Sequence, residues 1–438
     1  MKAKEIVLLI FIILAGVVLY HFQTGQINWD WDEEFIFIGD EYTYKDIQQI
    51  APPLPAELHV FNSHGRVEVI GSDRENIEIE LEKQIWNRKQ KRADEVNDAL
   101  KIGVSTEEDR IQITVNEEDL NRRRFRTNFK IYIPRNMPVN IKNSYGEVRV
   151  EAVGESQIVN RNGNVIAIDI AGRLYVNNSY NDVDLTNVSA DCEVDSHHST
   201  VEANNIKGSL KVTHRYGRIS AFQITGTTSI EGSHTEFIGH ELTGETNVNS
   251  SYRRIFLYDV GDVTLTGNSC PVEIEGTRGD VNITDKYSHV KLLNLSGNLI
   301  IDGKNLGITG KSIVGDLINI RSSYRDLELL DFSGQTTIWL DNGDMTLTPL
   351  PLTHPIEAKG DFTDITFYWP EGNTYPIEAH ARRGDIYWKL DEELDYEEEN
   401  GMSVIKAFSS EIGKPKIVLN SKDGKITIQK LLEKTPKF

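Results

Sequence analysis

Cysteine, methionine and basic side chains are scarce in this chain. Two cysteines among 438 residues exclude a disulfide scaffold and a Cys-rich zinc module. The chain has 47 Lys and Arg and 67 Asp and Glu, which gives a net charge of −20. This charge argues against a nucleic-acid-binding protein, because phosphate binding needs clustered cations. With 33 glycines, 13 prolines and 26% charged residues, the composition is typical of a folded chain. We therefore expect a folded, acidic protein.

One long apolar run stands near the N-terminus, from Ile6 to about Phe22. Its length is at the short end of what crosses a bilayer as a helix, so a cleaved signal peptide is the alternative. No small-x-small cleavage site follows the run, and no cysteine is present there for lipid attachment. The sequence therefore favours an uncleaved signal anchor at 6–24, after a cytoplasmic segment 1–5 and before a juxtamembrane linker 25–56.

The charges on either side of this run predict its orientation. Lys2 and Lys4 precede it, whereas Asp30, Asp32 and Glu33 follow it with no Lys or Arg before Lys45. Basic residues stay on the cytoplasmic side of a membrane span. We expect a single-pass membrane protein whose bulk lies outside the membrane, in the periplasm or at the cell surface.

A repeat occupies the middle of the chain. Segments such as NSYGEVRV (143–150), NSYNDVDL (178–185) and HRYGRISA (214–221) align, and their tyrosines recur after 35, 36, 36, 35 and 37 residues. Between them lie copies with a polar residue in place of tyrosine, such as RNGNVIAI and SHHSTVEA. The unit is therefore about 18 residues long, with a 36-residue super-period.

Each unit contains two short stretches of alternating apolar residues and a glycine between them. Alternation predicts strands with one buried face, and the glycine suits a corner that needs positive φ. Two strands of about five residues cannot bury that face alone, so neighbouring units must stack. We predict an all-β, single-stranded parallel β-solenoid (β-helix). Alternation of tyrosine with Asn or His favours 36 residues per turn, about six turns and roughly 30 Å, over 18 residues per turn.

The repeat predicts the remaining boundaries. A first unit, HVFNSHGRVEVIG (59–71), is followed by a strand in IEIELEKQIW, a helix from Lys91 to Leu100, and strands in VSTEEDRIQITV and FKIYIP. We interpret 57–142 as an N-terminal α/β cap, 143–349 as the regular solenoid, 350–430 as an irregular C-terminal solenoid cap and 431–438 as a tail. Residues 391–400, DEELDYEEEN, read as an exposed acidic loop.

These residues resemble a known family. An NSHGRVEV-type unit, paired strands around a helix, a strand ending in IP and repeats of N-x-x-G-x-V-x-V are similar to the bacterial putative-adhesin family over about 57–430. The resemblance implies a membrane-anchored or secreted β-solenoid of the cell envelope with no assigned function and no catalytic residues. This chain departs from the family's usual N-G corner by placing Tyr or His there, as in Tyr180, His198 and Tyr216.

The sharpest candidate for a binding site is this row of tyrosines with its neighbouring arginines. Aromatic faces stack on sugar rings, and Arg binds carboxylates of acidic glycans. The alternative is a structural ladder whose hydroxyls face water. The candidate binding residues are Tyr145, Tyr180, Tyr216, Tyr252, Tyr287, Tyr324, Arg215, Arg253 and Arg325.

Other chemistry is weakly signalled. His198 and His234 occupy equivalent places and raise the question of a metal, but Asn fills that slot at 162, 305 and 342, which favours a polar corner. Cys192 falls at an apolar core position, and Cys270, at a corner, is too distant to bridge to it. The acidic residues considered as candidate catalytic groups are those of any solvated sheet: Asp182, Asp184, Glu202, Glu273, Asp344 and Asp385. We expect no cofactor, no metal and no enzymatic activity.

Three functions remain open. The first is an adhesin that presents a rigid acidic solenoid to glycans or to another surface. The second is an envelope scaffold or stress-associated accessory protein that acts through protein partners, and the third is a polysaccharide-processing enzyme. An exposed Tyr-Arg stripe favours the first, an exposed apolar patch the second, and close carboxylates of raised pKa the third.

Overall fold

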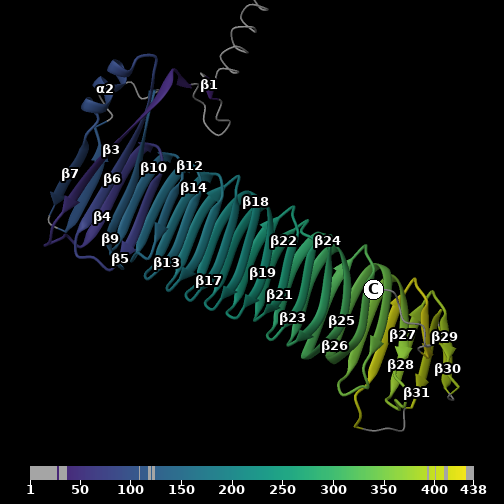
Figure 1. Ribbon diagram of the computed structural model, residues 1–438. Helices are drawn as coiled ribbons and strands as arrows, with labels where there is room; N and C mark the ends of the chain where they lie inside the picture. The colour runs from purple at the N-terminus through teal and green to yellow at the C-terminus, as the bar shows by residue number, and fades with distance from the viewer. Residues whose placement is uncertain are drawn as a thin grey trace, which may run out of the picture. The chain divides into compact units, whose positions relative to one another are not determined.

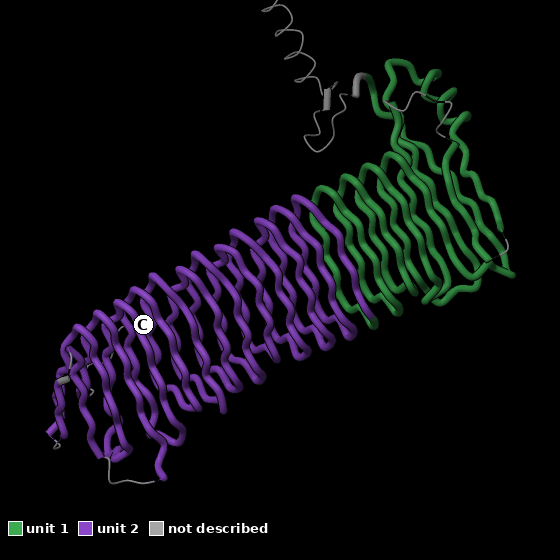
Figure 2. Tube along the Cα trace, turned by 180° about the vertical axis from the view of Figure 1, so that it is seen from behind, with its two compact units in different colours: residues 1–190 green, residues 191–438 purple. Residues whose placement is uncertain are grey.

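The structure is a computed structural model that describes residues 27–28, 37–107, 109–116, 120, 124–391, 394–399, 401–408 and 413–430. The predicted anchor 6–24 and the tail 431–438 lie outside these residues. Within them, no helix is long and apolar enough to cross a membrane. The chain forms a parallel β-solenoid of about 13 turns and divides into two compact units, residues 1–190 (unit 1) and 191–438 (unit 2), coloured separately in Figure 2.

One turn of the solenoid is a single unit of the repeat, so the expectation of two units per turn is wrong. Val139 pairs with Ser156 and Ser156 pairs with Leu174, so each turn advances the chain by one unit. In unit 2, a register shift between Val314 and Leu317 accompanies a longer turn, in which Ile308 pairs with Leu327. The unequal tyrosine spacings are therefore sums of two turns that differ slightly in length. Each turn contributes one strand to each of two sheets.

Unit 1 carries the N-terminal turns (Figure 1). One sheet has the order β8–β4–β10–β12–β14 and the other β3–β6–β9–β5–β11–β13–β15. The elements are β1 (Ile27–Asn28), β2 (Phe37–Ile38), β3 (Asp40–Ile50), β4 (Glu57–His64), β5 (Val67–Ser72), β6 (Ile77–Asn87), α2 (Gln90–Ala99), β7 (Ile102–Glu107), β8 (Arg110–Val115), β9 (Phe125–Pro134), β10 (Val139–Tyr145), β11 (Val148–Glu151), β12 (Ser156–Asn162), β13 (Val165–Ile170), β14 (Leu174–Tyr180) and β15 (Val183–Val188).

The N-terminal end of this stack is closed by antiparallel strands and one helix. β3 and β6 add antiparallel strands beyond β9, and β7 pairs with β8 as a hairpin, whereas the sequence predicts a single strand in VSTEEDRIQITV. The buried Lys83 on β6 holds the end of α2, because its Nζ donates to Asn97 O at 3.2 Å and Leu100 O at 2.7 Å. A cation at the last carbonyls of a helix satisfies acceptors that have no partner within the helix. The helix predicted at Lys91–Leu100 is confirmed, with its bounds shifted by one position.

Unit 2 is built from the same repeat, and several of its strands are longer because they run through the corners. Its elements are β16 (Cys192–His197), β17 (Thr200–Ile206), β18 (Leu210–Ile224), β19 (Thr228–Leu242), β20 (Thr246–Ser251), β21 (Ile255–Val260), β22 (Val263–Asn268), β23 (Val272–Thr277), β24 (Val281–Ser296), β25 (Leu299–Ser323), β26 (Leu327–Pro349), β27 (Ile356–Trp369), β28 (Ile377–Arg382), β29 (Ile386–Lys389), β30 (Asp395–Glu399), β31 (Met402–Ala407), β32 (Ile417–Lys422) and β33 (Ile426–Lys430).

The C-terminal end of unit 2 does not follow chain order. β32 pairs with both β27 and β28, so it returns to lie between two earlier strands. β33, which carries the last repeat-like segment, KDGKITIQ, likewise lies between β27 and β29. The acidic segment expected to be a loop contains β30, an exposed strand antiparallel to β31. β31 pairs antiparallel with β28, so antiparallel strands lie at this end of the stack, where a parallel edge would otherwise stay open.

The core is made of the inward-facing rows predicted from the alternation. Val148, Val150, Val165 and Val183 in unit 1 are fully buried, and each such side chain contributes roughly 1.5–3 kcal/mol. Cys192 occupies one of these positions at 2% exposure, as predicted. Cys192 and Cys270 are free and buried.

Most of the repeated glycines serve another purpose than expected. A Cβ on Gly226 would lie 2.6 Å from Gly208 C, and one on Gly244 would lie 2.3 Å from Gly226 O. These glycines permit close approach of successive backbones. The expected positive φ is found at Gly297 and Gly334, at 141° and 142°. In the other turns, the positive φ at that corner belongs to polar residues before the glycine, such as Asn205, Gln223 and Glu241.

Candidate functional site

The candidate site is the row of residues at the corner that joins the two strands of each turn, which we name the corner ladder. In unit 1 it comprises His64, Tyr145, Asn162 and Tyr180, which are paired by strand register. In unit 2 its members share a left-handed backbone with φ between 52° and 69°. They are His198, Tyr216, His234, Tyr252, Ser269, Tyr287, Asn305, Tyr324, Asn342 and, in the register of the last turns, Phe362, Asp423 and Arg383.

Four consecutive rings of unit 2 stack on one another. Ring centres lie 5.0 Å apart between His198 and Tyr216, 5.0 Å between Tyr216 and His234, and 4.8 Å between His234 and Tyr252. This spacing is close to the ~4.8 Å between paired strands, so the solenoid itself sets the stack. Tyr216 and Tyr252 are 50% and 54% exposed. One edge of this stack is therefore open to solvent.

The other tyrosines have different neighbours. Tyr145 is half-buried and stacks on His64 at 5.1 Å, and the exposed Tyr180 is paired with Asn162. Tyr287 lies between Ser269 and Asn305 in the ladder, and Tyr324 lies between Asn305 and Asn342. The structure therefore brings Tyr216 and Tyr252 together through intervening histidines, while Tyr287 and Tyr324 are separate exposed rings.

The backbone does not require rings at these corners. A left-handed conformation costs roughly 1–2 kcal/mol for residues other than glycine, and Asn or Asp adopts it most readily. The opposite corner of the same turns is also left-handed, and there the chain uses only small or polar side chains, among them Asp169, Asn205, Glu241 and Asp331. Stacking, at about 0.5–1.5 kcal/mol per pair, offsets the cost in the four-ring segment. Tyr287 and Tyr324 have no ring partner in the described residues to offset it.

The three predicted arginines do not form one stripe. Arg215 comes one residue before its ladder tyrosine, whereas Arg253 and Arg325 come one residue after theirs. All three are exposed. Cations therefore flank the ladder on both sides, in an arrangement that would bracket an anionic group placed over the rings.

The buried side of the same corner carries a second row, two residues before the ladder, which we name the inner row. In unit 1 it contains Asn62, Asn143, Asn160 and Asn178, whose amide nitrogens donate to backbone carbonyls of the corner. Asn143 Nδ2, for example, lies 3.0 Å from Gly146 O and 3.2 Å from Gly65 O, which joins adjacent turns. The inner row therefore fixes the corners on which the ladder stands.

In unit 2 the inner row contains two buried titratable residues. His214 contacts Ser199 Oγ at 3.1 Å and Thr235 Oγ1 at 2.9 Å, and burial lowers its pKa to about 4. Burial raises the pKa of Asp285 to about 6, and its Oδ2 has no hydrogen-bond partner. Both side chains are at most 2% exposed. Both side chains therefore lie on the buried side of the corner, away from the exposed ladder.

Metal and acid–base chemistry find little support in this geometry. His198 and His234 are separated by Tyr216, and no group of three His, Cys, Asp or Glu in the described residues could hold a metal ion. Of the acidic candidates, Glu273 pairs with Lys291 at 2.9 Å. Burial and the nearby carboxylates of Asp326 and Asp364 raise the pKa of Asp344. The Asp326 carboxylate is already engaged, however, because its Oδ1 accepts a hydrogen bond from the backbone N–H of Asp344.

A second aromatic stack was missed from the sequence. Phe222, His240 and Tyr258 lie on β18, β19 and β21, with ring centres 5.1 Å and 4.8 Å apart. They occupy an outward row of the other sheet and not the corner. Their regular spacing of one repeat unit is visible in the sequence and could have revealed them.

Comparison with known proteins gives no family assignment. No family model and no curated protein matches the chain. A solved structure of a putative cell adhesion protein from Clostridium sporogenes ATCC 15579 aligns with 89% of this chain and 100% of its own, at 8% identity and a TM-score of 0.16. So low a TM-score carries no argument about fold or function.

Proposed function

We propose that this chain is a non-enzymatic binding protein of the cell envelope that contacts surface glycans along the corner ladder. The observation that supports the proposal is the exposed stack His198–Tyr216–His234–Tyr252 on a rigid strand backbone. The exposed ring edges suit sugar hydroxyls, because neighbouring rings cover both faces of Tyr216 and His234, and Arg215 and Arg253 beside the stack suit acidic sugars. A repeated surface of this kind matches a ligand that is itself a repeating polymer.

Localisation is part of the same proposal. The apolar run from Ile6 to about Phe22 and the charges around it support a single membrane anchor at 6–24 with the solenoid outside. A glycan-binding surface would there meet the envelope or a neighbouring cell. The resemblance of the repeat to adhesins is consistent with that position.

The test is retention of the full-length protein, in mild detergent, on cell-wall and capsule polysaccharides over a salt series. The informative variant is Tyr216→Asn with Tyr252→Asn, because Asn occupies the same left-handed ladder position at Asn305 and Asn342 and should preserve the corner. At about 1 kcal/mol per ring, loss of two rings should weaken binding about thirtyfold. Tyr258→Asn removes an exposed ring outside the ladder and is the matched control.

Unchanged binding by the folded double variant would contradict the proposal. Loss of the β-type circular dichroism signal in that variant would instead show a structural ladder. If the wild-type protein is retained on no polysaccharide, an envelope scaffold acting through protein partners becomes the better explanation, and crosslinking would identify those partners.

A further inference from the structure

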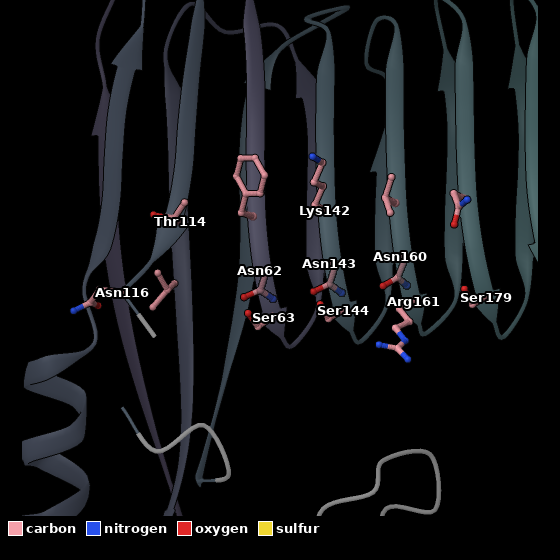
Figure 3. A pocket seen from close by; sticks show the side chains of 14 residues that line it. Asn62, Ser63, Thr114, Asn116, Lys142, Asn143, Ser144, Asn160, Arg161 and Ser179 are labelled. Carbon is pink, nitrogen blue, oxygen red and sulfur yellow. The ribbon is translucent and has the colours of Figure 1, made fainter. Parts of the chain in front are cut away.

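Unit 1 contains an open groove of about 790 Å³ on the outer face of the sheet formed by β8, β4, β10, β12 and β14. This volume is within the range of small-molecule sites. Figure 3 shows Asn62, Asn143 and Asn160 at one level of neighbouring strands, with Lys142 above Asn143 and Arg161 below Asn160. The groove borders the corner, since Ser144 and Ser179 directly precede the ladder residues Tyr145 and Tyr180.

The charges of this groove differ from those of the chain as a whole. Its fourteen lining residues include two cations, Lys142 and Arg161, and no carboxylate, although acidic residues outnumber basic ones by 67 to 47 in the sequence. Neither cation makes an ion pair with any residue that the structure describes. Lys142 Nζ lies 5.6 Å from the centre of the Phe61 ring, which it faces as a cation–π partner.

Another groove of unit 1 carries charges of both signs. It is lined by three cations, Lys45, Arg66 and Lys130, together with Glu80 and Glu82. Arg66 and Lys130 also contact Glu68, at 3.0 Å and 3.7 Å. Three carboxylates therefore lie in or beside that groove, and an anionic ligand would meet their repulsion. The groove with Lys142 and Arg161 lacks that repulsion.

Its remaining lining suits sugars. Ser63, Ser144 and Ser179 are outward residues of neighbouring strands, and successive strands are ~4.8 Å apart. Hydroxyl and amide groups both donate and accept, as sugar hydroxyls require. The inner-row bonds of Asn143 and Asn160 hold the strand ends in place, so little ordering is needed on binding.

We infer that this groove of unit 1 binds an anionic glycan, a sugar chain that bears carboxylate or phosphate groups, with Lys142 and Arg161 contacting those groups. The inference rests on the proposed glycan-binding function and names a ligand class, but its residues are separate from the four-ring stack. Carboxylate and phosphate are alike in charge and in accepting hydrogen bonds, so the two sources are separated by experiment.

The experiment measures binding of the full-length protein to four polymers: polygalacturonate, phosphomannan, neutral dextran and polyglutamate. The test variant combines Lys142→Gln with Arg161→Gln, both outward-facing changes. The matched control combines Arg173→Gln with Lys207→Gln, which removes the same charge from exposed positions outside the groove. Circular dichroism confirms that both variants are folded.

We expect the test variant to bind polygalacturonate or phosphomannan about tenfold more weakly than wild type, with a shallower salt dependence, and the control to stay within about twofold. The polymer that shows the larger loss identifies the source of the anion. Binding to dextran should not change.

Equal loss in test and control variants would overturn the inference, as would unchanged binding in the test variant. Binding of polyglutamate as tight as that of the anionic glycans would also overturn it, in favour of an acidic peptide. If wild type binds neither anionic glycan, the inference about the groove is rejected and the proposed ladder function is not. The ladder has its own test, which compares wild type with the Tyr216→Asn and Tyr252→Asn variant on all the cell-wall and capsule polysaccharides. Conversely, loss confined to the Lys142 and Arg161 variant supports the groove and rejects the ladder.

Discussion

Asp285 should make this protein less stable at neutral pH than in mild acid. Its carboxyl is buried under the corner at Tyr287, and one oxygen has no hydrogen-bond partner. Burial raises its pKa from 3.8 to about 6. Because the folded pKa lies above the unfolded one, the folded state holds the proton more tightly, and stability falls as the pH rises from about 4 through about 6.

The size of the effect follows from the same pKa values. A difference of about two pKa units corresponds to about 3 kcal/mol, all of it lost above pH 7. The change that tests this is Asp285→Asn. Asn is the residue that unit 1 uses in the same inner row, at Asn143, Asn160 and Asn178, where its amide donates to a carbonyl of the corner. The variant therefore removes the charge and keeps a side chain that the corner accepts.

The assay is urea unfolding of wild type and variant at pH 4.0 and pH 7.5, followed by circular dichroism and tryptophan fluorescence. At pH 7.5 the variant should be more stable by about 2–3 kcal/mol, and at pH 4.0 the two proteins should agree within about 0.5 kcal/mol. Because a solenoid need not unfold in one step, the comparison uses the transition that contains β24. An equal difference at both pH values would refute the reasoning, since it would show an effect of packing and not of charge.

Two further predictions concern buried groups of unit 2. Burial lowers the pKa of His214 from 6.5 to about 4. The stability that the neutral His214 contributes is therefore fully present above pH 6.5 and is lost as the pH falls towards 4. His214→Asn should remove up to about 3 kcal/mol of this loss of stability in acid, measured by the same unfolding series. Burial raises the pKa of the Cys192 thiol to about 12 and also raises that of Cys270, so iodoacetamide should modify neither in the native protein and both in guanidinium chloride, as mass spectrometry would show. Rapid native labelling of Cys192 would mean that its turn opens.

The sequence predicted the solenoid because one rule, apolar alternation within a short repeat, determines both the strands and their stacking. Rows such as Val148, Val165 and Val183 could be assigned to the core directly. The number of units per turn could not, because Tyr and His differ chemically yet stack equally well at ~4.8 Å. The expectation of two units per turn assumed that Tyr and His occupy different positions within one turn. They occupy the same corner position in successive turns.

The site was predictable only in part. That Tyr216 and Tyr252 share a row follows from their spacing, but their exposure and the left-handed backbone beneath them do not. Arg215 and Arg253 lie near tyrosines in the sequence, yet a difference of two positions places them on opposite sides of the ladder. The groove near Lys142 depends on β8, which pairs with β4 although β5, β6, α2 and β7 come between them in the chain. No local pattern could indicate that pairing.

Tyr and His alternate along the four-ring segment, so the order of the rings repeats every two turns and not every turn. Removing one whole turn preserves the alignment of every inward side chain but brings like rings together, whereas removing two turns preserves both the core and the order of the rings. A single-residue deletion would instead send a strand's core side chains to the solvent face. Duplication or loss of two-turn blocks is therefore the neutral route by which such a protein changes its length. The number of rings it presents would then vary in steps, with their spacing unchanged.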